Sequence, residues 1–261
     1  MMNESERDEF YIGYLPQAPR KVAIWVRRCC LALFAVAALT VILLVTGQHR
    51  FPLSVFEFQQ YRQFEGVVRE KPYPMLLVRR PGETWKSSGV SSYLLVSPGK
   101  HGADDEAAGF DGKQVQLQGS LIYRGEMVMI EVIPHSLKTI GETAGMSEDQ
   151  QAKASEDLGI FTLTGEIVDS KCYLGVMNPG QTKPHRECAV RCISGGAPPL
   201  FIARDANGRT VSLVLVSADH QPVNQKVLNL VAEPVEISGR VVREGEQLFL
   251  EADPKTYRRI E

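Results

Sequence analysis

The chain has no block of like charge. Its 29 lysines and arginines and its 31 aspartates and glutamates are interspersed, and the net charge is −2. Proteins that bind nucleic acid usually gather Lys and Arg into one patch or stripe. This charge distribution therefore predicts no nucleic-acid partner.

Several enzyme motifs are also missing from the sequence. It contains no phosphate-binding loop, no dinucleotide-binding fingerprint and no G-x-S-x-G nucleophile elbow. These absences exclude the motif-defined nucleotide-binding and hydrolase classes. We expect a binding protein rather than an enzyme, with no catalytic residue and no organic cofactor site indicated.

Charge is absent from one long stretch, the nineteen residues from Cys29 to Gly47. A helix of that length spans about 30 Å, which is the thickness of the hydrocarbon core of a bilayer. A buried helix of a soluble protein would normally show a polar face, and this stretch shows none. The sequence therefore predicts a transmembrane helix over residues 22–47, as the single span of a bacterial inner-membrane protein.

Basic residues on the N-terminal side of this span indicate its orientation. Arg20, Lys21, Arg27 and Arg28 precede the apolar stretch, and cytoplasmic flanks carry an excess of Lys and Arg. We therefore expect residues 1–21 to be a cytoplasmic tail and the rest of the chain to be periplasmic. The Arg27-Arg28 pair is also compatible with a twin-arginine export signal, although topology charges are the favoured interpretation.

After the span, short apolar or β-branched runs bounded by Pro and Gly predict strands. Two blocks of this pattern are alike, because residues 115–131 align without gaps on residues 235–251. Each block is a predicted hairpin with a glycine at its turn, Gly125 in one and Gly245 in the other. The repeat predicts a tandem duplication.

The predicted fold class is mainly β, with the transmembrane helix followed by two small barrels. The strand spacing resembles that of the oligonucleotide/oligosaccharide-binding (OB) barrel, which has five strands. We expect a first OB-like domain at residues 48–139, a linker at 140–159, and a second OB-like domain at 160–261. An immunoglobulin-like sandwich is the alternative, but each copy is a strand or two short of it.

The second copy contains an unusual concentration of soft ligands. Cys172, His185, Cys188 and Cys192 fall within 21 residues, and the first copy has no cysteine. Residues 185–194 predict a short helix that places the last three ligands within an arc of about 60°. If Cys172 meets that face from across the loop, the four form a metal site suited to Zn²⁺, Cu(I) or an iron–sulfur centre.

A disulfide is the competing interpretation, because exported cysteines usually oxidise. Cys172 would then pair with Cys188 or Cys192 and leave one thiol over. A redox pair built on Cys188 beside His185 is a third possibility. Two nearby acids, Asp169 and Glu187, are either outer contacts of the site or surface residues, and surface residues are favoured.

The run from Asp169 to Gly175 (DSKCYLG), followed by the H-x₂-C-x₃-C spacing of His185, Cys188 and Cys192, resembles a segment of uncharacterised bacterial single-pass membrane-anchored proteins. This resemblance carries no known activity. Together with the ligand set, the sequence predicts a membrane-tethered periplasmic protein that binds a metal or acts in redox or assembly, with a membrane or periplasmic protein partner. The alternative is a non-catalytic scaffold or partner-binding protein whose cysteines form a structural disulfide.

Overall fold

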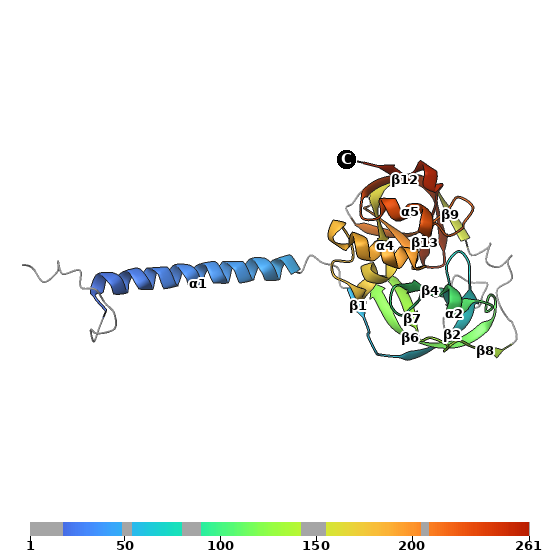
Figure 1. Ribbon diagram of the computed structural model, residues 1–261, viewed down its shortest axis with the longest axis horizontal. Helices are drawn as coiled ribbons and strands as arrows, with labels where there is room; N and C mark the ends of the chain where they lie inside the picture. The colour runs from blue at the N-terminus through green and yellow to red at the C-terminus, as the bar shows by residue number, and fades with distance from the viewer. Residues whose placement is uncertain (1–17, 49–53, 80–89, 142–154, 205–208, 261) are drawn as a thin grey trace, which may run out of the picture. The chain divides into compact units, whose positions relative to one another are not determined.

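A computed structural model describes residues 18–48, 54–79, 90–141, 155–204 and 209–260 (Figure 1). The chain divides into two units, Met1–Pro52 and Leu53–Glu261. Most of the predicted cytoplasmic tail, residues 1–17, lies outside the described residues.

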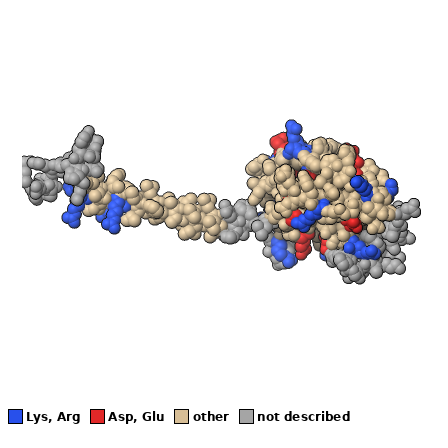
Figure 2. All heavy atoms as spheres, turned by 90° about the horizontal axis from the view of Figure 1, so that it is seen from below, with Lys and Arg blue, Asp and Glu red and all other residues tan. Residues whose placement is uncertain are grey.

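The first unit contains one long helix, α1 (Arg20–Gln48). It is long and apolar enough to span a membrane, and its large side chains are exposed, Phe34 by 76%. Figure 2 shows basic atoms near the start of the helix and none along the rest of its visible face. The hydroxyls of Thr40 and Thr46 donate hydrogen bonds to the backbone carbonyls of Val36 and Ile42. The helix itself therefore satisfies these polar groups. The predicted apolar helix is confirmed, with bounds that differ by one or two residues.

The second unit begins with a closed barrel of five strands. Going round the barrel, β2 pairs with β3, β3 with β4, β4 with β7, β7 with β6, and β6 with β2. Only the β4–β7 pairing is parallel. The strands are β2 (Arg62–Arg69), β3 (Met75–Arg79), β4 (Val90–Ser97), β6 (Gln114–Arg124) and β7 (Met127–Val132). The short elements around them are β1 (Ser54–Phe56), β5 (His101–Gly102), α2 (Asp104–Ala107) and β8 (Lys138–Gly141).

A second barrel of five strands repeats the same order. Here β9 pairs with β10, β10 with β11, β11 with β13, β13 with β12, and β12 with β9. The parallel pairing is again between the third and fifth strands, β11 and β13. The strands are β9 (Ser155–Asp169), β10 (Pro199–Arg204), β11 (Thr210–Val216), β12 (Pro234–Glu244) and β13 (Gln247–Glu251). The short elements that follow β11 and β13 are α5 (Asn224–Val227), η4 (Leu228–Leu230), η5 (Pro254–Thr256) and β14 (Arg258–Arg259).

Glycines occupy matching places in the two barrels. Gly125 and Gly245 have φ of 60° and 59° in their hairpin turns, a conformation that favours residues without a Cβ. In the first strand of each barrel, a Cβ on Gly66 would lie 2.4 Å from Leu77 O, and one on Gly165 would lie 2.3 Å from Ile202 O. The mainly β class and the two barrels are confirmed.

The predicted linker, residues 140–159, is partly strand. Residues 140–141 belong to β8 and residues 155–159 belong to β9, while 142–154 lie outside the described residues. Residues 155–159, the start of β9, fall within the range that the sequence predicts as a linker. They form a strand because they pair with β12, where Arg240 and Arg243 form ion pairs with Asp157 and Glu156.

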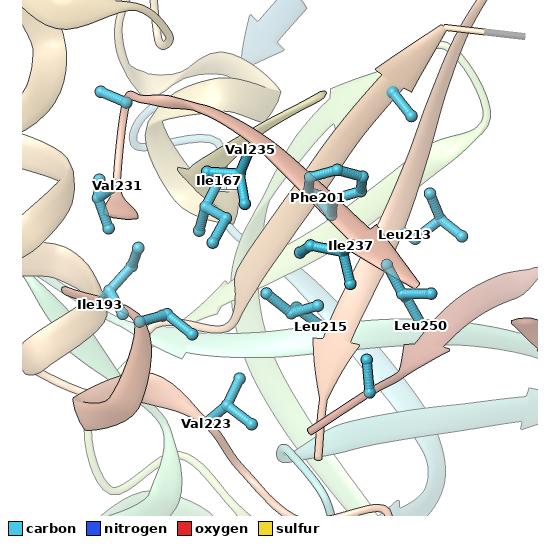
Figure 3. Close-up of a cluster of buried hydrophobic side chains, with 14 of the residues drawn as sticks. Ile167, Ile193, Phe201, Leu213, Leu215, Val223, Val231, Val235, Ile237 and Leu250 are labelled. Atoms are coloured by element: carbon cyan, nitrogen blue, oxygen red, sulfur yellow. The ribbon is translucent and has the colours of Figure 1, made fainter. Parts of the chain in front are cut away.

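Each barrel has an apolar interior, and a third core joins the two. Figure 3 shows the interior of the second barrel, where Phe201, Leu215 and Ile237 pack together. Met75 and Ile122 of the first barrel share a core with Phe249 of the second. Tyr73 Oη, also from the first barrel, donates to Leu215 O at 3.1 Å. The two barrels therefore form one packed body.

Candidate metal centre

The cysteine-bearing segment is an insertion between β9 and β10 of the second barrel. It consists of the helical turns η2 (Cys172–Val176) and η3 (Lys183–His185), followed by helix α4 (Arg186–Ser194). Pro184 suits the helix start and Gly195 follows its end. The helix predicted for residues 185–194 is present, with His185 in the turn just before it. Figure 1 shows α4 in the region where the two barrels meet.

The structure brings the sequence-predicted ligands together around Cys172. Its Sγ lies 3.9 Å from the Sγ of Cys188. Ligand atoms of Cys172, His185 and Cys188 all lie within 4.8 Å of one another, and so do those of Asp169, Cys172 and Cys192. These are two groups that share Cys172. The sequence analysis named four of these five residues as ligands and Asp169 as an outer contact or a surface residue.

All five cysteines of the chain are described and all are free. A disulfide has its sulfurs about 2.05 Å apart, well below the 3.9 Å between Cys172 and Cys188. The structure therefore has no disulfide staple in this insertion. Cys172 and Cys192 are buried, whereas Cys188 is only half-buried.

Asp169 is the ligand that the sequence analysis placed wrongly. It was expected at the surface, but it is fully buried at the end of β9. Its Oδ1 accepts a hydrogen bond from the Cys172 backbone N–H at 2.7 Å, and its Oδ2 lies 3.0 Å from His185 Nε2. The other acid, Glu187, is a surface residue as expected, with a side chain 87% exposed.

The contact between Asp169 and His185 is typical of metal-binding histidines. Such residues usually hydrogen-bond a carboxylate or carbonyl through the ring nitrogen that does not bind the metal. Asp169 is placed to be that carboxylate when Nδ1 of His185 faces an ion. The imidazole is itself 4% exposed, so its position is fixed by packing as well as by this hydrogen bond.

Hydrogen bonding within the cluster separates the acidities of two thiols. The hydrogen bond to Cys192, with burial adding to it, raises the pKa of Cys172. The same hydrogen bond lowers the pKa of Cys192. The shared hydrogen bond therefore makes Cys192 the more acidic of these two thiols.

Lys100 is a contributor that the sequence analysis did not find. It lies in the turn between β4 and β5 of the first barrel, and its Nζ is 2.7 Å from the Sγ of Cys188. This hydrogen bond raises the pKa of Lys100 and keeps its charge at the sulfur cluster. The two partners are 88 residues apart in the sequence, and no local sequence pattern predicts such a pair.

The Lys100 turn is held in place by contacts on both sides. Lys171 Nζ donates to Ser97 O at 2.7 Å and to Gly99 O at 2.8 Å, and it pairs with Glu131 Oε2 at 2.5 Å. On the other side, Gly102 N donates to Gly195 O at 2.9 Å. The first barrel therefore forms one wall of the cysteine cluster.

Chemically, the cluster offers three sulfurs, an imidazole and a carboxylate. Thiolate and imidazole ligands suit Zn²⁺ and Cu(I), and thiolates also hold iron–sulfur centres, whereas Mg²⁺ and Ca²⁺ require oxygen ligands. Met177, another sulfur residue of this insertion, has a side chain 46% exposed at the surface. The geometry therefore fits a soft or borderline ion.

Comparisons with known proteins add no family to this description. A scan against models of protein families gives no match to this chain, and a search of curated proteins also gives none.

Proposed function

We propose that this protein is a membrane-tethered, periplasmic metal-binding protein whose ion is held by Cys172, His185, Cys188 and Cys192. Asp169 orients the imidazole in this proposal, and Lys100 offsets the negative charge of the thiolates. The ion is Zn²⁺ or Cu(I), or an iron–sulfur centre takes its place.

One distance carries the proposal. Two sulfurs that bind the same tetrahedral Zn²⁺, each at about 2.3 Å, lie about 3.8 Å apart. Cys172 Sγ and Cys188 Sγ are 3.9 Å apart, which matches one edge of such a tetrahedron. His185 belongs to the same close group, so an ion can be bound with little rearrangement.

The cluster is better suited to a metal than to a structural disulfide. A structural disulfide needs two sulfurs, but three lie close together here. A disulfide also makes no use of an imidazole. His185 and Asp169 are both buried against the cluster. Burying such groups costs free energy unless they have partners. Asp169 and His185 already partner each other at 3.0 Å, and a bound ion would supply a partner to the sulfurs as well.

The rest of the chain supports the location and the fold class in this proposal. The basic residues before the apolar part of α1 favour a cytoplasmic N-terminus and export of both barrels. Five strands in a closed barrel, with a short helix before the fourth strand, agree with an OB-like assignment. A protein tethered in this way can act on a partner protein in the same membrane or in the periplasm. In this proposal, it exchanges electrons with that partner or assists its assembly.

The experiment is metal analysis of the full chain purified in mild detergent. We expect about one ion per chain if Zn²⁺ or Cu(I) is bound, with loss of the metal in Cys172→Ser and Cys188→Ser. Cys29→Ser and Cys30→Ser are matched controls, because these thiols lie in α1. A metal content far below one per chain that no Cys→Ser change alters would contradict the proposal, as would a stable Cys172–Cys188 disulfide found by mass mapping.

A further inference from the structure

Two exposed aromatic side chains lie on one turn at the start of the second unit. The connection from β1 to β2, residues 57–61 and here called the aromatic turn, carries Phe58 and Tyr61, which are 63% and 60% exposed. The turn is ordered: Gln60 N donates to Glu57 O at 3.0 Å, and the ring of Phe58 lies 5.3 Å from that of Phe56. The rings are therefore presented to the surroundings by a defined backbone.

The covalent chain limits how far this turn can move from the membrane. The apolar part of α1 ends at Gly47, and β1 begins at Ser54. Six residue steps separate Gln48 from Ser54, and a fully extended chain of six steps spans about 21 Å. If α1 crosses a bilayer, its last apolar residues lie at the edge of the hydrocarbon core, so β1 starts no more than about 21 Å beyond that edge, a range that includes the headgroup layer.

We propose that the aromatic turn inserts Phe58 and Tyr61 into the interfacial layer of the membrane that α1 spans. Aromatic rings concentrate at this layer, where the ring body is apolar and a tyrosine hydroxyl reaches water or headgroups. Arg62, which follows the turn, forms an ion pair with Glu57 Oε2 at 2.6 Å, and its side chain is 52% exposed. The inference rests on the membrane-spanning part of the proposed function and does not depend on the metal.

Other exposed apolar residues lack this tether. Ile160, on β9, is 72% exposed, which makes it as available to solvent as Phe58. It belongs to the second barrel, whereas the aromatic turn directly follows β1, the first element after the tether. Exposure alone therefore does not distinguish the aromatic turn, whereas exposure next to the tether does. Ile160 supplies a matched control.

The insertion would also hold the cysteine segment close to the bilayer. β1 packs directly against η2, since a Cβ on Gly175 would lie only 2.5 Å from Val55 O. Arg124, whose strand β6 pairs with β1, donates to Tyr173 O at 2.9 Å. A turn fixed in the interface therefore keeps η2, which begins at Cys172, near the membrane surface.

Tryptophan quenching in the full chain tests this proposal. Phe58→Trp and Ile160→Trp are each reconstituted into phosphatidylcholine vesicles with and without bromine on the acyl chains. The emission of the natural Trp25 and Trp85 is subtracted by using the wild-type chain. We expect bromine to quench the tryptophan added at position 58 and to leave the one added at 160 unquenched. Tyr61→Trp repeats the test if Phe58→Trp does not fold.

Each result decides the proposal. Equal quenching at positions 58 and 160, or none at either, overturns insertion of the aromatic turn. Phe34→Trp, at a position inside the uncharged part of α1, is measured in the same way and reports whether the helix is inserted. An unquenched tryptophan at position 34 overturns this inference together with the membrane span. Metal content measured on the same samples is independent of these outcomes, so failure of the metal site is recognised separately.

Discussion

Lys100 Nζ and Cys188 Sγ, which belong to different barrels, lie 2.7 Å apart. The ammonium group is the positive charge placed directly at a cluster of three thiols. A bound ion held by three thiolates retains excess negative charge, and a nearby cation stabilises that complex. The first barrel has no cysteine, yet it contributes to the cysteine chemistry of the second through this one side chain.

Replacing Lys100 therefore weakens metal retention. We expect Lys100→Met to lower metal affinity by up to about fivefold, because an exposed charge pair contributes at most about 1 kcal/mol. Lys100→Arg keeps the charge and most of the affinity. Competition with a chromophoric chelator measures both variants. Lys138→Met, at an exposed position on β8, is the control. If the metal affinity of Lys100→Met equals that of this control, Lys100 does not contribute to the site.

Removing the Asp169 carboxylate affects both stability and metal binding. Asp169→Ala leaves the buried Cys172 N–H and the His185 ring without their acceptor. We expect a stability loss of about 1–3 kcal/mol and metal affinity about 10–100-fold lower. Asp169→Asn, which retains an acceptor oxygen, should lose less. Denaturant unfolding and chelator competition test this against Glu187→Gln, which should behave as the wild type because its side chain is exposed.

The metal-free protein should show split thiol ionisation. The hydrogen bond from Cys172 lowers the pKa of Cys192, so one thiolate forms below the ordinary thiol value of about 8.5. Hydrogen bonding and burial raise the pKa of Cys172, so that thiol stays protonated well above it. Thiolate absorbance near 240 nm against pH measures this. Thiol ionisations that all fall together near the ordinary value would contradict the assignment, and Cys192→Ser should remove the early step.

This split also fixes the sign of one contribution to stability. A group whose pKa is lowered on folding stabilises the native state above its unfolded pKa, and that stabilisation is lost as pH falls through the lowered value. Cys192 therefore makes the metal-free protein less stable as pH falls below the ordinary thiol range. Cys172, with a raised pKa, acts in the opposite sense, and its stabilisation is lost as pH rises through the raised value. Urea unfolding of wild type and Cys192→Ser at several pH values separates the Cys192 contribution.

A substitution at the contact between the barrels tests whether the wall of the site matters. A Cβ on Gly102 would lie 2.3 Å from Gly196 O, so Gly102→Val must displace the turn that carries Lys100. We expect lower thermal stability and weaker metal binding. Gly141→Val is the control, since a Cβ there meets its nearest neighbour only at 4.0 Å. Unchanged metal affinity in Gly102→Val would mean that the turn is not part of the site.

Local patterns in the sequence predict the parts of this fold that depend on neighbouring residues. The uncharged stretch predicts α1, the repeated hairpins predict both barrels, and Pro184 with Gly195 predicts α4. The ligand spacing likewise predicts that Cys172, His185 and Cys188 converge, because three of the ligands lie on or next to one short helix.

The rest depends on contacts between distant segments. Asp169 looked like a surface acid, because burial of a carboxylate is decided by partners that arrive later in the chain, here His185 and the Cys172 backbone. The core shared by the two barrels and the contact of Lys100 with Cys188 join residues far apart in sequence. Neither hydrophobic periodicity nor ligand spacing carries that information.

The central claim is tested most directly by X-ray absorption spectroscopy of the full chain loaded with Zn²⁺. Convergence of three thiols and one imidazole predicts three sulfur scatterers at about 2.3 Å and one nitrogen at about 2.0 Å, and it predicts one sulfur fewer in Cys192→Ser. A first shell of oxygen and nitrogen alone, unchanged in that variant, would contradict the account.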